Sequence, residues 1–212
     1  MPAATAPPSL TAATLRQGVR ELASRDAGLA AIVARHGHPP MWGRARGFAT
    51  LVQIILEQQV SLASAAAMFA KIERELGGVT PATVRAAGRP GLQALGVTRQ
   101  KAGYVCTLAE QVTDGTLPLS TLARLPDAEV MEALVRVPGI GPWTASIYLL
   151  MALRRPDVWP PGDLALHKAM ARLPGHTRVP TSDEAAAFAL RWRPWRAVAA
   201  RILWHAYLSE RG

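Results

Sequence analysis

Apolar residues recur along this chain at the three- and four-residue spacing of helices. Leu15, Val19 and Leu22 show this spacing near the start, and a denser apolar run at 48–58 indicates a buried helix. No stretch alternates apolar and polar residues as a half-buried strand does. The pattern predicts an all-α fold. Its helices are expected at 11–23, 26–37, 48–58, 61–77, from 80, 90–95, 99–112, 127–135, 143–153, from 163, 182–192 and 195–210.

Polar residues at the starts of these segments are typical helix caps. Asp26, Ser61, Asp127 and Ser182 can each accept a hydrogen bond from the first turn that follows. Proline is favoured in a first helical turn, so Thr80-Pro81 also predicts a helix start. Residues 1–10 are rich in alanine and proline, and we expect them to form a frayed tail.

Composition excludes several classes of protein. With one cysteine, Cys106, the chain has no disulfide framework, no cysteine-rich zinc site and no four-cysteine iron–sulfur cluster. Its longest apolar run is about nine residues (145–153), far below the ~20 that a membrane span needs. The first residues lack the basic and apolar regions of a signal peptide, so we predict neither export nor a membrane span.

The net charge of +9 suggests an anionic partner, nucleic acid first. Only three of the 24 basic residues are lysines, which fits the codon bias of a GC-rich genome and weakens the inference. Position is more telling. Residues 133–212 contain 11 basic and 5 acidic residues, which places most of the excess in the last third. We interpret that third as facing negative charge.

The segment LVRVPGIGPWTA, residues 134–145, is the most informative stretch. Gly139 and Gly141 permit positive φ and close backbone approach, while Ile140 between them can anchor the turn. A Gly-rich turn before a helix start can bind a phosphate oxygen through its amides. A bare GxG would be an ordinary helical turn, but the whole string favours a DNA-binding helix–hairpin–helix. The candidate phosphate-binding residues are Val137, Gly139, Ile140, Gly141 and Thr144.

Three further motifs accompany the hairpin: LEQQVS at 56–61, PGD at 161–163 and RWRPWR at 191–196. In this order they resemble the helix–hairpin–helix (HhH-GPD) superfamily of DNA glycosylases, and within it the 3-methyladenine DNA glycosylase II (AlkA-type) branch, which has RWKPWR at the last motif. The resemblance runs from about Trp42 to Tyr207.

The resemblance implies two helical subdomains with the active-site cleft between them. We expect 1–45 and 155–212 to form one subdomain and 46–154 the other, a helical barrel with the hairpin at about 125–153. Longer bacterial members have a β-rich N-terminal domain, for which this chain shows no pattern.

Asp163 matches the aspartate that the family uses in catalysis. Cleavage of an N-glycosidic bond places positive charge on the sugar, which a carboxylate beneath it can stabilise. The same carboxylate can orient or deprotonate the attacking water. From spacing alone, Asp163 would be only a helix cap after a proline-rich loop. The hairpin upstream makes catalysis the favoured interpretation.

Bifunctional relatives place a nucleophilic lysine two residues after the second hairpin glycine, where this chain has Trp143. Lys168 lies five residues after Asp163, on a helix expected to face elsewhere. Without a placed amine no Schiff base forms. We therefore predict hydrolysis to an abasic site without strand cleavage.

Trp143 and Trp204 match the two pocket tryptophans of the branch. Indole faces attract cations, and N3- or N7-alkylated purines are cationic. Core packing is the alternative role of any single tryptophan, and we expect it for Trp192 and Trp195. Where the branch often has pocket tyrosines, this chain has Ile147 and Leu164. This predicts a more apolar pocket, which leaves alkylated pyrimidines and N1-methyladenine open as substrates.

Gln59 matches the position that fills the gap left by the flipped base, and Gln58 that of a contact to a neighbouring base. A pair of solvent-facing glutamines is the plainer alternative. Arg99 and Lys101 begin a helix and either bind phosphate or form a solvated face. The five histidines do not form a metal site.

The resemblance thus implies a monomeric, monofunctional glycosylase of the cytoplasm that flips and excises alkylated bases from double-stranded DNA. It implies no required cofactor, although relatives can bind a monovalent cation at the hairpin carbonyls. Two alternatives stay open: a glycosylase for uracil or oxidised purines, and a non-catalytic DNA-damage binding module.

Overall fold

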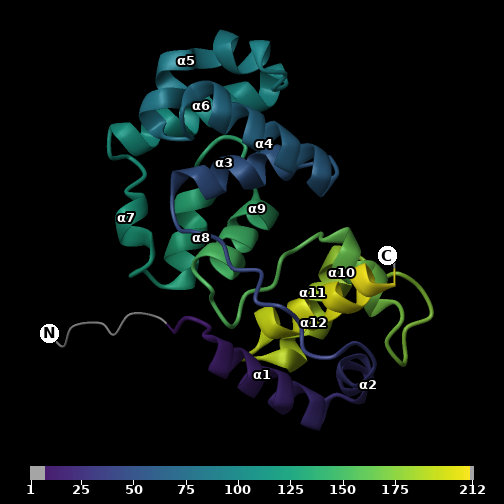
Figure 1. Cartoon of the computed structure of the whole chain (residues 1–212). Helices are drawn as coiled ribbons and strands as arrows, with labels where there is room; N and C mark the ends of the chain where they lie inside the picture. The colour runs from purple at the N-terminus through teal and green to yellow at the C-terminus, as the bar shows by residue number, and fades with distance from the viewer. Residues whose placement is uncertain (1–7, 211–212) are drawn as a thin grey trace, which may run out of the picture. The chain divides into compact units, whose positions relative to one another are not determined.

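The computed structural model describes residues 8–210, and its regular structure in that range is all helical, which confirms the predicted fold class (Figure 1). The chain packs as two units, which are described separately below. Unit 1 comprises residues 44–148, and unit 2 comprises residues 8–43 together with the chain from residue 149 onward. The sequence placed the corresponding boundaries near residues 45 and 155.

Unit 1 is organised around α3, which packs against α4, α6 and α9, while α5 lies beside α6 and α8 beside α9 (Figure 1). Seven of the ten residues of α3 are buried, as expected of a helix that is apolar on most of its faces. The helices of unit 1 are α3 (Phe48–Glu57), α4 (Leu62–Leu76), α5 (Pro81–Ala94), α6 (Arg99–Thr113), α7 (Leu119–Leu122), α8 (Asp127–Val135) and α9 (Pro142–Ile147).

Unit 2 is organised around α12, which packs against α1, α2 and α10. Nine of its fourteen residues are buried. The helices of unit 2 are α1 (Ala12–Arg25), α2 (Ala27–His36), α10 (Leu164–Met170), α11 (Ser182–Ala189), the 3₁₀ turn η2 (Leu190–Trp192) and α12 (Arg196–Ser209).

The predicted helix starts are confirmed at Asp26, Ser61 and Thr80, whose side chains each accept a bond from a first-turn amide. Two predicted caps are wrong by one residue. Thr181 rather than Ser182 caps α11, and Asp127 is the first residue of α8, which has no side-chain cap. A cap has to adopt extended φ/ψ, and residue type alone does not identify which of two adjacent polar residues does so.

Two other expectations need correction. Residues 1–7 of the predicted tail lie outside the described residues, but Leu10 is buried and donates its N–H to Arg154 O at 2.7 Å, so the tail does not extend to it. The helix predicted to end at residue 153 is α-helical only to Ile147. It continues as a π-helix over Tyr148–Ala152, a widening that apolar periodicity does not reveal.

Candidate active site and nucleic-acid interface

The turn between α8 and α9 in unit 1 is built on two buried apolar side chains, Val137 and Ile140. Both backbone amides serve the turn itself: Val137 N–H donates to Leu134 O and Ile140 N–H to Val137 O, each at 3.0 Å. Among the described residues, the amides of Gly139 and Gly141 have no acceptor. The turn therefore leaves these two donors for a ligand.

The two glycines of the turn serve different purposes. Gly139 has φ +87°, and a Cβ placed there would lie 2.2 Å from the Tyr104 ring, so the fold itself requires glycine. Gly141 has φ −87°, and a Cβ there would meet nothing within 4 Å. The fold does not require glycine at residue 141, which is consistent with a ligand that approaches the backbone closely.

The end of α3 is tied to this turn through Gln58. Its Nε2 donates to Gly139 O at 2.8 Å and to Thr144 Oγ1 at 2.9 Å, which uses both amide hydrogens. The sequence did not indicate this support of the hairpin by Gln58. Because these bonds hold the Gln58 side chain at the turn, its neighbour Gln59 is the better candidate for a base contact from this end of α3.

Lys101 secures the same segment from α6. Its Nζ donates to Leu56 O at 2.7 Å and to Gln58 O at 2.8 Å, so it satisfies carbonyls that the end of α3 leaves without helical partners. Burial lowers the pKa of the ammonium. The structure thus gives Lys101 a role in supporting the end of α3, which neither of the two alternatives suggested by its position included.

The loop after this anchor is exposed and strained. Gln59 has φ +58°, which is rare for a residue other than glycine. It lies at the surface beside Val60 and Leu62, two large apolar side chains that are also exposed, Leu62 by 63%. A strained turn that presents such residues to solvent can insert them into a partner.

Helix α9 carries the candidate pocket residues of unit 1. Trp143 is half-buried on its first turn, directly after the hairpin, whereas Ile147 at its end is buried. Thr144 lies between them, buried, and accepts the Gln58 bond. The hairpin and Trp143 are thus positioned by the same short helix.

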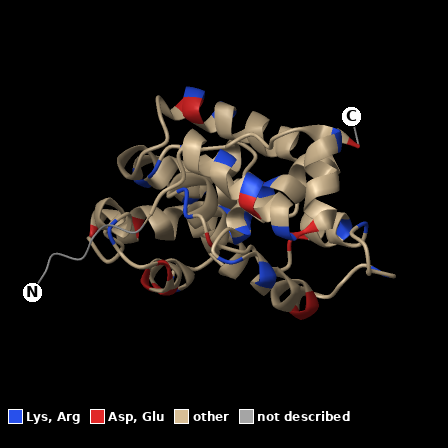
Figure 2. Cartoon of the chain, turned by 90° about the horizontal axis from the view of Figure 1, so that it is seen from below, with Lys and Arg blue, Asp and Glu red and all other residues tan. Residues whose placement is uncertain are grey.

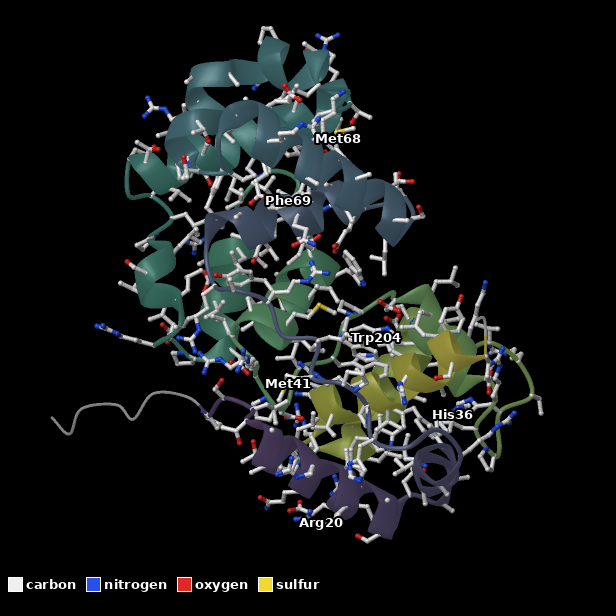
Figure 3. All side chains as sticks on the ribbon, viewed as in Figure 1. Arg20, His36, Met41, Met68, Phe69 and Trp204 are labelled. Atoms are coloured by element: carbon white, nitrogen blue, oxygen red, sulfur yellow. The ribbon has the colours of Figure 1, made fainter. Side chains whose placement is uncertain are left out.

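Asp163 and Trp204 meet in unit 2. Asp163 is the N-cap of α10, and its Oδ1 accepts from Leu166 N–H at 3.0 Å and from the Trp204 indole N–H at 3.2 Å. Only 8% of each residue is exposed, whereas Leu164 next to Asp163 is 59% exposed. Trp204 projects from α12 (Figure 3). The structure thus brings together Asp163 and Trp204, two of the sequence-predicted residues, and the Leu166 and Trp204 N–H groups are among the contacts that hold the carboxylate.

Helix α12 is held in place by a buried arginine that the sequence did not single out. Arg201 donates to the carbonyls of Met41, Ala197 and Leu150 at 2.8–3.0 Å. Burial lowers its pKa to about 10, so it remains cationic at neutral pH. Leu150 belongs to the π-helix, and Arg201 therefore links that irregular turn to the helix that carries Trp204.

The charges do not follow the expected distribution. Basic and acidic residues are spread over the helices and loops (Figure 2), and several arginines of the last third are buried or paired with carboxylates. Arg155 and Arg201 are buried, while Arg172, Arg178 and Arg196 pair with carboxylates. The hairpin itself belongs to unit 1, which has ten basic and eight acidic residues. The positive excess of the last third is therefore not a measure of charge at the hairpin.

Within residues 8–210, every helix is too short or too polar to span a membrane. Nor does that range contain a group of three or more His, Cys, Asp or Glu side chains arranged to hold a metal ion.

Comparison with known proteins places this geometry in context. Residues 52–195 match the family described as HhH-GPD superfamily base excision DNA repair protein. A putative DNA-3-methyladenine glycosylase of Bacillus subtilis is 28% identical over 84% of this chain and 65% of its own length. DNA-3-methyladenine glycosylase 2 of Escherichia coli is 32% identical over 73% of this chain and 55% of its own length. The chain thus spans less than two thirds of either relative.

Solved structures agree. A DNA-3-methyladenine glycosidase from Bacillus halodurans matches with a TM-score of 0.77 at 28% identity, over 91% of both chains. A 3-methyladenine DNA glycosylase of Schizosaccharomyces pombe in complex with abasic DNA has the same fold, with a TM-score of 0.77 at 24% identity over 89% of this chain and 95% of its own.

Proposed function

The chain belongs to the HhH-GPD superfamily of base excision DNA repair proteins, and we propose that it is a monofunctional DNA glycosylase for alkylated bases. Its substrates would be double-stranded DNA with bases of the 3-methyladenine and 7-methylguanine type. The names of the relatives support this substrate class. The observation that carries the proposal is the buried Asp163 carboxylate, held by the Trp204 indole N–H.

Asp163 would act beneath the sugar of the flipped nucleotide. As the N-glycosidic bond breaks, its electrons leave with the base and positive charge develops on the sugar. A carboxylate that is already oriented stabilises this charge without reorganisation. The N–H donors to Oδ1 hold the carboxylate in one orientation, and the same group can also orient the water that attacks the sugar.

Trp143 and Trp204 would bind the flipped base. An alkylated purine is cationic, so indole faces attract it, and its charge also makes it a good leaving group. The N–H bond to Asp163 fixes the orientation of the Trp204 ring. Ile147 and Leu164 would add apolar contacts and leave the pocket without a general acid.

The hairpin would bind a backbone phosphate through the amides of Gly139 and Gly141. Val137 and Ile140 then act as its buried anchors and Thr144 as the acceptor that aligns Gln58. Relatives can bind a monovalent cation at the hairpin carbonyls, of which Val137 O and Gly139 O here already accept from Ile140 N–H and Gln58 Nε2. When bound, such an ion would add positive charge beside the phosphate.

Gln59 would occupy the gap left by the flipped base, because its strained, exposed turn already presents it to a ligand.

Trp143 occupies the position at which a lyase has its nucleophilic lysine, so water would be the nucleophile and an abasic site the product. One lesion offers no two-fold symmetry, which favours a monomer. We place the activity in the cytoplasm, with the DNA.

The test uses a labelled duplex with one 3-methyladenine or 7-methylguanine analogue, under single-turnover conditions with alkali to reveal abasic sites. Asp163→Asn should retain the α10 cap, because asparagine is an equally good N-cap, but should slow excision on the order of 10²-fold or more. Parallel duplexes with uracil or 8-oxoguanine test the other lesion classes. Borohydride trapping should give no covalent adduct.

The chain contains a matched control. Asp26 also caps a helix, α2, and accepts an indole N–H, that of Trp192, at 2.8 Å. Asp26→Asn should therefore reproduce any loss of stability without the loss of excision. Equal activities of the two variants would refute the role of Asp163. Tight lesion binding without base release by the wild type would favour the damage-binding alternative.

A further inference from the structure

A surface depression of about 500 Å³ lies in unit 1, on the side of the hairpin formed by α6. Its floor comes from α6, one wall from the second half of α5, and its edge from the first residue of the hairpin turn proper, Pro138. The residues that line it and enter the argument are Arg89, Arg99, Gln100, Gly103, Tyr104 and Pro138.

Both arginines of the depression are exposed, and within residues 8–210 neither forms a salt bridge. A Cβ at Gly103 would lie 3.9 Å from the Arg89 guanidinium carbon, an ordinary contact distance, which places that group close over α6. Glu110 follows on α6 and is not paired with either of them. Two guanidinium groups therefore share one opening without a protein counter-ion.

The depression is continuous with the proposed phosphate site. The Tyr104 ring packs directly beneath Gly139, and its hydroxyl accepts from Gln100 Nε2 at 2.8 Å. A ligand strand held at Gly139 and Gly141 would therefore meet Pro138 and Tyr104 next, and then the arginines. This continuity favours a nucleic-acid strand over an acidic protein as the occupant.

We propose that this depression, the α5–α6 arginine surface, is a second phosphate-binding surface for the DNA that the hairpin holds. It rests on the proposed function, in that it assumes a DNA ligand. Arg89 and Arg99 each present a planar fork that suits phosphate oxygens, and Gln100 and Tyr104 line the surface between them with polar atoms. The arginines contact backbone, so they add affinity without reading sequence.

The experiment measures the affinity of the full chain for an undamaged, fluorescein-labelled duplex between 50 and 300 mM salt. Arg89→Gln and Arg99→Gln should each reduce the slope of log affinity against log salt by about 0.9, and the double variant by about 1.8. Arg124→Gln is the matched control, because Arg124 is likewise exposed and unpaired in unit 1 but lies outside the depression.

A double variant with the wild-type slope and unchanged melting temperature overturns the inference, whatever else the surface binds. Since both side chains are exposed, the variants should fold normally. Arg89→Lys and Arg99→Lys should restore most of the slope. If the wild type excises bases but the double variant keeps the wild-type salt slope, the second phosphate-binding surface is refuted and the proposed enzyme activity is not. If the double variant has a reduced salt slope but the wild type excises no base from any duplex, the proposed enzyme activity is refuted and the second surface is not.

Discussion

At the residue scale, Asp163 is both a helix cap and the carboxylate that we propose for catalysis. The same Oδ1 that receives the first-turn amide of α10 receives the Trp204 indole N–H, so capping fixes the carboxylate in place. The sequence presented these two roles as alternatives. It could not show the indole bond, because 41 residues separate the partners.

The two hairpin glycines allow a sharper residue-scale prediction. Gly139→Ala should destabilise the protein by about 1–3 kcal/mol from backbone strain at φ +87°, and by more from the clash with Tyr104. Gly141→Ala should leave the melting temperature unchanged, since a methyl group there meets nothing. Its duplex affinity should nevertheless fall about tenfold, because the methyl group would hold a bound phosphate away from the backbone amide and weaken one charge-assisted hydrogen bond.

Thermal melts and fluorescence-anisotropy titrations with one duplex would measure both effects side by side. If Gly141→Ala bound DNA as tightly as the wild type, no phosphate would approach the backbone closely at residue 141. If Gly139→Ala were as stable as Gly141→Ala, the close packing of the turn on Tyr104 would be wrong.

At the element scale, local sequence located the helices well because their caps are local interactions. Ser61 and Thr80 act on amides three residues away, and the break in α5 falls at Gly88, whose φ of +61° fits the two short helices expected there. The π-helix over Tyr148–Ala152 and the support of the end of α3 by Lys101 could not be read in this way. The carbonyls of these two segments are satisfied by Arg201 and Lys101, which are distant in the sequence.

Lys101 provides the element-scale prediction. Lys101→Met keeps the aliphatic stem but leaves the carbonyls of Leu56 and Gln58 without their donor, which should cost about 1–3 kcal/mol. The loss should also loosen Gln58 and lower the excision rate. Lys71→Met, at an exposed position of α4, should change stability by less than about 0.5 kcal/mol.

Urea denaturation of both full-length variants gives the comparison directly. Equal unfolding midpoints for Lys101→Met and Lys71→Met would show that the carbonyls at the end of α3 do not depend on the ammonium. A Lys101→Met variant with wild-type stability but a lower excision rate would instead show that Lys101 acts by positioning Gln58 and the loop beside it.

At the scale of the whole molecule, composition suggested the class of partner that we propose, but for an incomplete reason. The +9 charge pointed to nucleic acid, but only tertiary structure decides which arginines remain available. Arg201 is buried among carbonyls and Arg196 bonds Asp157, whereas Arg89 and Arg99 in unit 1 are unpaired. The sequence motifs identified the hairpin because a hairpin is formed by consecutive residues. The pairing of arginines across unit 2 has no such local signature.

This difference between total and available charge can be measured. Arg172→Gln with Arg178→Gln lowers the net charge from +9 to +7, but both arginines are paired with carboxylates, Glu210 and Glu184. We therefore expect the salt slope of duplex binding to stay at its wild-type value. If affinity followed net charge, the slope would instead fall by about 1.8, as for two lost phosphate contacts. Anisotropy titrations from 50 to 300 mM salt separate the two outcomes, because a retained slope shows that the location of each arginine governs DNA binding.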